Sequence, residues 1–270
     1  MVAAAAVIGF TGIPAHAATR QSLYLALGDS LAFGYQPTHI PGQGYVDDLY
    51  AHLHATDPGL QLVNLGCPGE TTGTMITGGI CPYDGAADQL DAAVAMLRSH
   101  RLPVRLITID IGANDVDGCV QGTSIDPTCI NNGLQTIGRN LVQIVVRLRA
   151  AAPFARIVAM TYYDPFLAAY LAGPGGPALA QQSLAITDTL NTLETFIYRL
   201  LGFRVADVAG AFSTDDFSTL VPLPGVGNVP LDVARICQWT WMCVPPPLGP
   251  DIHANPDGSA VIAQAFQARL

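Results

Sequence analysis

The fold is decided by the stretch at residues 23–31, which reads LYLALGDSL. Its first five residues are all apolar, and a short apolar run bounded by turn-forming residues is typical of a buried strand. Gly28, Asp29 and Ser30 follow at once, and these residue types end strands and form turns. The stretch therefore predicts a buried strand that delivers polar side chains at its carboxyl end.

The same kind of apolar run recurs along the chain and alternates with segments of helical spacing. Further strands are predicted at residues 60–65, 104–111, 156–162 and 203–208. Apolar residues recur at intervals of three and four in the helices predicted at residues 45–56, 87–97, 134–148 and 177–200, and a terminal helix is predicted from residue 255. This alternation predicts an α/β fold, in which a five-stranded parallel sheet has helices on both faces.

Composition limits the classes of protein that remain. The chain has 270 residues, of which 50% are hydrophobic and 12% charged, so it has material for a core and is not disordered. The net charge of −9 argues against a nucleic-acid partner. All 12 basic residues are arginines, which excludes a P-loop lysine and a lysine-bound cofactor.

The N-terminus resembles a signal peptide. Residues 2–14 are mostly apolar, and Ala15-His16-Ala17 has the small-x-small pattern of a cleavage site. No arginine precedes Arg20, so the basic start of such a peptide is missing and a truncated start is expected. We therefore predict a signal peptide at residues 1–17, an extracellular location, and a single domain at residues 18–270. No run of about 18 apolar residues predicts a membrane span.

Six cysteines form three pairs of near neighbours, separated by 14, 10 and 6 residues. Short loops cost little entropy to close, so we predict the disulfides Cys67–Cys81, Cys119–Cys129 and Cys237–Cys243. A zinc site is the alternative, but the chain has no CxxC motif and no histidine close to a cysteine pair.

Polar residues follow three of the predicted strands. They are Ser30 after the first, Gly66 after the second and Asn114 after the third. The carboxyl ends of parallel strands meet at one edge of a sheet, where ligands bind. A hydroxyl, a backbone N–H and a side-chain amide are what acyl transfer requires of a nucleophile and its oxyanion donors. The missing base is supplied by His253, just before the terminal helix.

These residues resemble the SGNH (GDSL) hydrolase family. The matching blocks occur in the family's order, at residues 28–31 (GDSL), Gly66, residues 112–115 (GAND) and His253. The resemblance implies a flavodoxin-like three-layer sandwich and an esterase or lipase that needs no metal or cofactor. It also implies that Ser30 is the nucleophile and His253 the base. The N–H groups of Ser30 and Gly66 and the side chain of Asn114 would form the oxyanion hole.

The last block departs from the family pattern. The family has Asp-x-x-His, whereas here Pro250 lies three residues before His253 and the nearest acid, Asp251, lies two before it. The imidazole needs an acceptor that fixes its tautomer. Either Asp251 or a main-chain carbonyl of Pro250 or Asp251 can serve, and the unusual spacing favours the carbonyl.

The protein is therefore predicted to be a secreted, monomeric serine esterase or lipase that acts on a small-molecule or lipid ester. A carbohydrate O-acetylesterase would use the same residues, and an inactive binding module with the same fold is the alternative from another class. Asp29 is expected to brace the nucleophile turn. The acids Asp110, Asp115 and Asp117 fit neither a calcium loop nor a glycosidase pair well.

A segment rich in proline and glycine, at about residues 209–250, is predicted to be an irregular insertion. Trp239 and Trp241 lie within or beside its short cysteine loop, which cannot easily bury two indoles. This favours a role in the acyl pocket. The alternative is that the indoles pack on the sheet edge.

Overall fold

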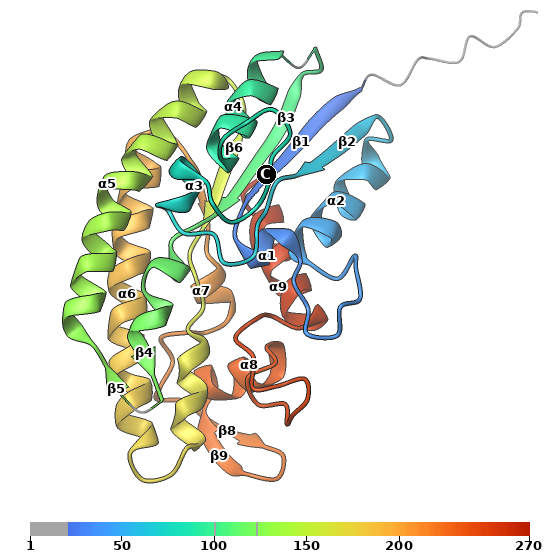
Figure 1. Ribbon diagram of the computed structural model, residues 1–270. Helices are drawn as coiled ribbons and strands as arrows, with labels where there is room; N and C mark the ends of the chain where they lie inside the picture. The colour runs from blue at the N-terminus through green and yellow to red at the C-terminus, as the bar shows by residue number, and fades with distance from the viewer. Residues whose placement is uncertain (1–20, 100, 123) are drawn as a thin grey trace, which may run out of the picture.

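Five parallel strands form the central sheet of the computed structural model, which describes residues 21–99, 101–122 and 124–270 (Figure 1). The predicted signal peptide lies outside the described residues. The strands pair in the order β2-β1-β3-β6-β7. They are β1 (Ser22–Gly28), β2 (Leu60–Asn64), β3 (Val104–Asp110), β6 (Ile157–Met160) and β7 (Arg204–Ala206). The predicted five-stranded parallel sheet is confirmed, with strand ends that shift by a few residues.

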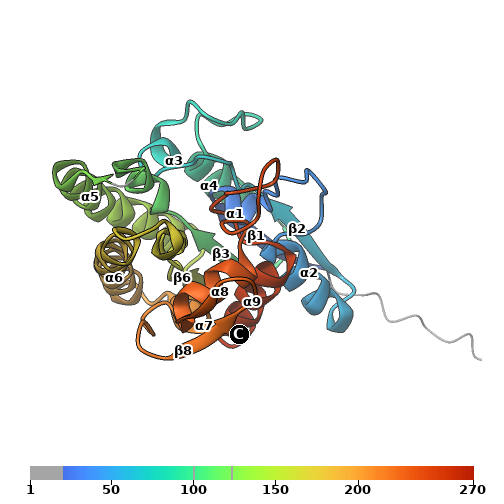
Figure 2. The ribbon, with the colours of Figure 1, turned by 90° about the horizontal axis from the view of Figure 1, so that it is seen from below.

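Helices cover both faces of this sheet, which gives three layers (Figure 2). On one side lie α2 (Tyr45–Thr56), α7 (Val208–Ala211) and α9 (Pro256–Gln267). On the other side lie α4 (Gln89–Ser99), α5 (Pro127–Ala151) and α6 (Gly176–Leu200). In α5 the predicted apolar face is buried, because Ile137, Leu141, Ile144 and Leu148 recur every three or four residues and are 0% exposed. No helix in the described part of the chain is long and apolar enough to cross a membrane.

Short elements follow the carboxyl ends of the strands. They are α1 (Ser30–Phe33), α3 (Thr74–Thr77), η1 (Ala113–Asp115), η2 (Asp117–Cys119), the pair β4 (Val120–Gln121) and β5 (Ser124–Ile125), and η3 (Pro165–Leu171). In Figure 1 these strand ends point towards the lower half of the molecule, where the pocket described below lies. The sheet therefore presents its loops as one working edge, as open α/β sheets do.

The segment at residues 209–250 is less irregular than expected. It contains a hairpin of β8 (Leu220–Leu223) and β9 (Gly227–Pro230), followed by α8 (Leu231–Trp239). Helix α8 buries Val233 and Ile236. The prediction was wrong here because these elements are too short to show a period between the surrounding prolines and glycines.

The three disulfides join the predicted pairs. Cys67–Cys81 closes the loop after β2, Cys119–Cys129 fastens η2 to the start of α5, and Cys237–Cys243 ties α8 to the loop before α9. All six cysteines are paired. Each bridge therefore restrains a segment near the working edge of the sheet.

Candidate active site

A tight turn after β1 places Ser30 at the start of α1. Gly28 has φ +138°, and a Cβ there would lie 2.2 Å from the Asp110 carbonyl oxygen, so only glycine fits the turn. Asp29 caps α1, and its Oδ1 accepts a hydrogen bond from the Leu31 N–H at 2.8 Å. The strand end and the cap together hold the Ser30 hydroxyl at the working edge.

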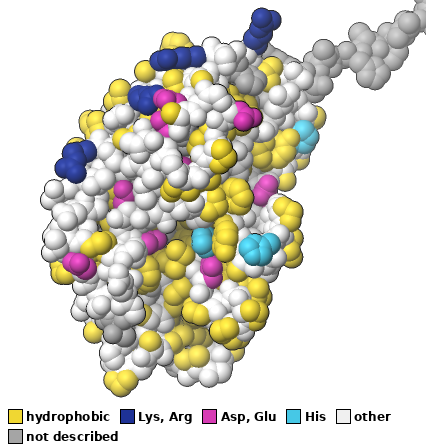
Figure 3. Space-filling view, in the orientation of Figure 1, with side chains coloured by type: hydrophobic (Ala, Val, Ile, Leu, Met, Phe, Trp, Pro, Cys, Tyr) yellow, Lys and Arg dark blue, Asp and Glu magenta, His cyan; other side chains and the backbone are white. Residues whose placement is uncertain are grey.

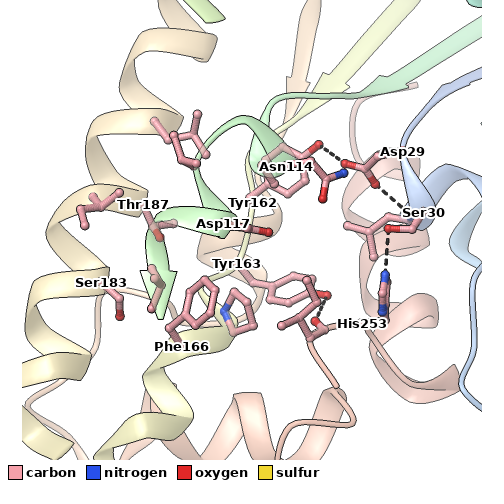
Figure 4. Close-up of a pocket in the computed structure, with 18 of the residues that line it drawn as sticks. Asp29, Ser30, Asn114, Asp117, Tyr162, Tyr163, Phe166, Ser183, Thr187 and His253 are labelled. Atoms are coloured by element: carbon pink, nitrogen blue, oxygen red, sulfur yellow. Dashed lines mark hydrogen bonds between the residues drawn. The ribbon is translucent and has the colours of Figure 1, made fainter. Parts of the chain in front are cut away.

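The imidazole of His253 meets the Ser30 hydroxyl on one side (Figure 4) and an acid on the other. Nε2 of His253 lies 2.8 Å from Oγ of Ser30, and Nδ1 lies 2.6 Å from Oδ1 of Asp251. With Nδ1–H donating to the carboxylate, Nε2 is left to accept the serine proton. The three side chains thus have the geometry of an acid, a base and a nucleophile in series.

The expectation that a main-chain carbonyl orients His253 is wrong. Oδ1 of Asp251 also accepts from the His253 backbone N–H at 2.9 Å. This local turn folds the carboxylate back over its own chain and brings it beside the imidazole. A spacing of two residues therefore suffices where the family pattern has three.

The loop that carries His253 is held from two sides. The Trp241 N–H donates to the His253 carbonyl at 3.1 Å, and the Tyr163 hydroxyl donates to the Ile252 carbonyl at 2.9 Å. The ring of Tyr35 packs on the imidazole, with centroids 4.4 Å apart. These contacts fix the direction from which the imidazole meets Ser30.

The predicted pocket role of the segment at residues 209–250 is also wrong. None of its residues lines the pocket beside Ser30. The Trp241 indole N–H donates to Gln36 Oε1 at 2.8 Å, and Trp239 packs against Phe212 and Arg235. Trp241 reaches the segment after α1, whereas Trp239 packs within residues 209–250, so this segment supports the site from outside the pocket.

Two buried acids lie beneath the nucleophile turn. Oδ2 of Asp110 accepts from the N–H groups of Asp29 at 3.3 Å and Ala32 at 3.2 Å, and Tyr45 donates to its Oδ1. Oδ2 of Asp29 accepts from the Tyr162 hydroxyl at 2.9 Å. Burial raises the pKa of both carboxyls, and that of Asp110 is raised further by the neighbouring Asp29. The bracing expected of Asp29 is thus present, and Asp110 shares it.

Asn114 reaches the pocket with one donor to spare. Its Nδ2 donates to the Glu70 carbonyl at 2.9 Å, and the side chain lines the pocket. A primary amide has two N–H groups, so the second is available to a ligand. Nearby, Asp115 accepts from the N–H of Thr72 at 2.8 Å and from its hydroxyl at 2.7 Å, which ties the loop before α3 to η1.

Gly66 was expected at the oxyanion hole, but the structure does not bring it into the pocket. Its N–H donates to Asn64 Oδ1 at 2.9 Å, and it is not among the residues that line the pocket. A Cβ on Gly66 would lie 2.5 Å from the Phe33 nitrogen, so this glycine allows the strand end to pack on α1. The prediction is wrong because a close-packing glycine and a ligand-binding glycine look alike in a sequence.

A second glycine, which the sequence reasoning missed, also lies outside the pocket lining but has the free N–H that was expected of Gly66. Gly69 has φ +81°, and no hydrogen bond from its N–H occurs in the described part of the chain. The Glu70 N–H donates to the Cys67 carbonyl, so Pro68 and Gly69 form the centre of a turn next to the carbonyl that Asn114 binds. Pro-Gly is the signal that could have found this turn.

The pocket beside Ser30 lies between η1, η2, η3 and α6 (Figure 4). Its apolar lining comprises Val116, Val120, Ile130, Phe166, Ile186 and Leu190. On the face drawn in Figure 3, hydrophobic side chains gather around the histidines in the centre, whereas the visible arginines lie above them. In the described part of the chain, no group of three His, Cys, Asp or Glu residues could hold a metal ion.

Comparisons with solved structures find the same fold. The chain resembles the extracellular lipase of Streptomyces rimosus, with a TM-score of 0.61 and 20% identity over 92% of this chain and 100% of that one. It also resembles a putative GDSL-like lipase of Parabacteroides merdae (TM-score 0.59, 14% identity, 93% and 96% covered). A third similar structure is phospholipase A1 of Streptomyces albidoflavus (0.51, 18%, 92% and 99%). At these identities the likeness shows the fold.

The family follows from the sequence match. No curated protein matches the chain at a significant level. Residues 26–261, however, match the GDSL-like lipase/acylhydrolase family, and this range contains Ser30, Asn114 and His253. The chain therefore belongs to the GDSL-like lipase/acylhydrolase family of hydrolases.

Proposed function

We propose that the protein is a secreted serine esterase that hydrolyses carboxylic esters through an acyl-enzyme on Ser30. The observation that carries this proposal is the pair of contacts at His253, 2.8 Å to Ser30 Oγ and 2.6 Å to Asp251 Oδ1. Serine is a weak nucleophile unless an adjacent base takes its proton, and these contacts provide that base and its orienting acid.

The reaction has two halves. His253 takes the proton of Ser30 as Oγ attacks the ester carbonyl, and then gives it to the departing alcohol. Water next attacks the acyl-enzyme, again with His253 as the base, and releases the acid and the free serine. The Asp251 carboxylate stabilises the imidazolium that forms in each half.

Three donors are proposed for the oxyanion. They are the N–H of Ser30, the free amide N–H of Asn114 and the N–H of Gly69. No hydrogen bond from the Ser30 or Gly69 N–H occurs among the described residues, and Asn114 has one N–H uncommitted. Preorganised donors of this kind typically contribute about 3–4 kcal/mol each to transition-state stabilisation.

The apolar pocket supports an acyl chain longer than acetyl, which favours an esterase or lipase over a carbohydrate O-acetylesterase. Secretion is supported by the three disulfides, because such bonds persist in oxidising compartments outside the cytosol.

The test is a series of p-nitrophenyl esters with acyl chains of two to twelve carbons, run beside labelling with a fluorophosphonate. We expect hydrolysis of medium chains and one label, which peptide mass spectrometry places on Ser30. A correctly folded Ser30→Ala protein should be unlabelled, with kcat lower by about 10⁴-fold or more. If the wild type neither hydrolyses an ester nor takes the label, the inactive binding module is the correct description.

A further inference from the structure

One carboxyl group interrupts the apolar pocket. Asp117 lies on η2 and lines the pocket beyond Asn114, between α6 and Ser30 (Figure 4). Its carboxyl takes part in none of the hydrogen bonds or ion pairs of the described residues. A polar group in an apolar cavity costs free energy unless something satisfies it. Asp117 is partly exposed to the pocket, so its carboxyl has no partner within the described protein and can be reached by a bound molecule.

The other acid of the pocket is not in this situation. Asp29 also lines the pocket, but its two oxygens accept from Leu31 and Tyr162. Asp117 thus differs from Asp29 in being available to a bound molecule. Ser183 and Thr187 also line the pocket and project from α6, on the far side of Asp117 (Figure 4).

The chemistry of Asp117 selects what it binds. Burial, with Asp29 and Asp164 nearby, raises its pKa to about 8, so the carboxyl is mostly protonated at neutral pH. A neutral carboxyl donates one hydrogen bond and accepts others, which matches a hydroxyl group. No arginine lines the pocket, so a substrate carboxylate would find no counter-ion there.

We propose that Asp117 binds a hydroxyl group on the acyl chain, so that the preferred substrates are esters of hydroxycarboxylic acids. The acyl group is the part concerned, because the pocket that Asp117 lines is the one proposed above for the acyl chain. This inference rests on the proposed esterase function. A site built to bind a hydroxyl discriminates against the analogue that lacks it, since its own polar group is then left unpaired.

The test compares ethyl 3-hydroxybutanoate with ethyl butanoate, with acid release followed by pH-stat titration at pH 7. The wild type should prefer the hydroxylated ester in kcat/KM by about tenfold or more, the value of one good hydrogen bond. In Asp117→Leu this preference should reverse, with a gain on butanoate. In Asp117→Asn, which still donates and accepts, it should remain within about threefold of the wild-type ratio.

Asp215→Asn is the matched control, because Asp215 is exposed and lies outside this pocket. If Asp117→Leu does not fold, Asp117→Ala replaces it. Equal kcat/KM for the two esters in the wild type, or a preference that survives Asp117→Leu or Asp117→Ala, overturns the inference and leaves the esterase intact. Failure of the esterase itself would appear separately, as loss of the fluorophosphonate label on Ser30.

Discussion

Buried acids differ in their hydrogen bonding on the two sides of Ser30. On the side of β1 and β3, Asp29 and Asp110 accept hydrogen bonds from backbone N–H groups and tyrosine hydroxyls. On the side of α6, both carboxyl oxygens of Glu194 and one of Asp164 are buried without a partner in the described structure. The difference lies in the hydrogen bonds, because the carboxyls of Asp29 and Asp110 hold the nucleophile turn whereas those on the α6 side are buried with oxygens that bind nothing.

The unpaired acids make the α6 side sensitive to pH. Burial raises the pKa of Glu194, and it raises that of Asp164 from an ordinary value near 3.8 to about 7. Such groups are neutral in the folded state but ionise in the unfolded state, where water solvates the charge. The stability of the α6 side should therefore depend on pH. Burial also raises the pKa of Asp29 and Asp110, but there the hydrogen bonds to both carboxyls partly offset it, so the loss of a single hydrogen bond matters as well.

After Ser30 itself, the largest effect on the nucleophile side is expected at Asp251. Asp251→Asn keeps the shape but replaces the acceptor of His253 Nδ1–H with a neutral amide, which also favours the wrong tautomer. We expect kcat to fall by about 10³–10⁴-fold, by analogy with the same change in a serine-protease triad. Steady-state kinetics on a p-nitrophenyl ester measure this. A loss of tenfold or less in a folded variant would mean that a main-chain carbonyl orients the ring after all.

On the α6 side, Asp164→Asn should change how the free energy of unfolding depends on pH. Below about pH 3 Asp164 is protonated in both states and carries no penalty. As the pH rises to about 7, only the unfolded state ionises, so wild-type stability falls, by about 4 kcal/mol at about 1.4 kcal/mol per pH unit. Asparagine cannot ionise, so the variant should gain about this amount over the wild type between pH 4 and 8.

Urea unfolding at pH 4, 6 and 8 measures that difference, with Asp215→Asn as the control because Asp215 is exposed. The mutation's direct effect on packing cancels when the two proteins are compared across pH. Parallel stability curves for the wild type and Asp164→Asn would show that Asp164 is ionised in the folded protein.

The sequence predicted most of the fold because periodicity reports burial. The apolar run at residues 23–27 and the helical spacing from Ile137 to Leu148 each describe a buried surface, and both elements formed as predicted. Three side chains of the site, Ser30, Asn114 and His253, could be located because each follows a strand or precedes a helix. In the structure all three line one pocket.

The predictions that were wrong concern residues whose roles depend on contacts between segments distant in sequence. Gly66 and Gly69 are three residues apart, and only the packing of α1 and the partners of each N–H distinguish them. The role of Trp241 depends on Gln36, some two hundred residues away in the chain. No local pattern records such pairs, so the sequence could indicate polar or aromatic residues of interest but not their partners.

A smaller effect is expected at the disulfide beside the His253 loop. Cys237–Cys243 closes a short loop whose Trp241 N–H binds the His253 carbonyl. Replacing both cysteines with serine should lower the free energy of unfolding by about 2 kcal/mol, the loop entropy of so short a bridge. The variant should also lose activity, because the same loop orients the imidazole. Chemical denaturation and ester kinetics together test this, and an unchanged kcat would show that Tyr163 and Tyr35 hold the loop unaided.

The smallest effect expected is a decline in kcat/KM at alkaline pH, caused by the ionisation of Asp117, which lies between Ser30 and α6. Asp117 is neutral below about pH 8 and ionised above it. The ionisable groups that interact most with Asp117 are the acids Asp29 and Asp164. Tyr162 and Tyr163 stay neutral because burial raises their pKa values. Ionisation therefore adds a negative charge that no cation in the pocket offsets, and an apolar acyl chain must then bind against it.

For ethyl butanoate, kcat/KM in the wild type should consequently decline by a few-fold between pH 7.5 and 9, since partial exposure of Asp117 lets water screen the charge. Asp117→Asn has no charge to gain and should show no such decline. Rates corrected for spontaneous hydrolysis at each pH give the comparison. If kcat/KM declines equally in both proteins, another group causes the decline. Water then screens the charge of Asp117 so well that its ionisation does not affect substrate binding.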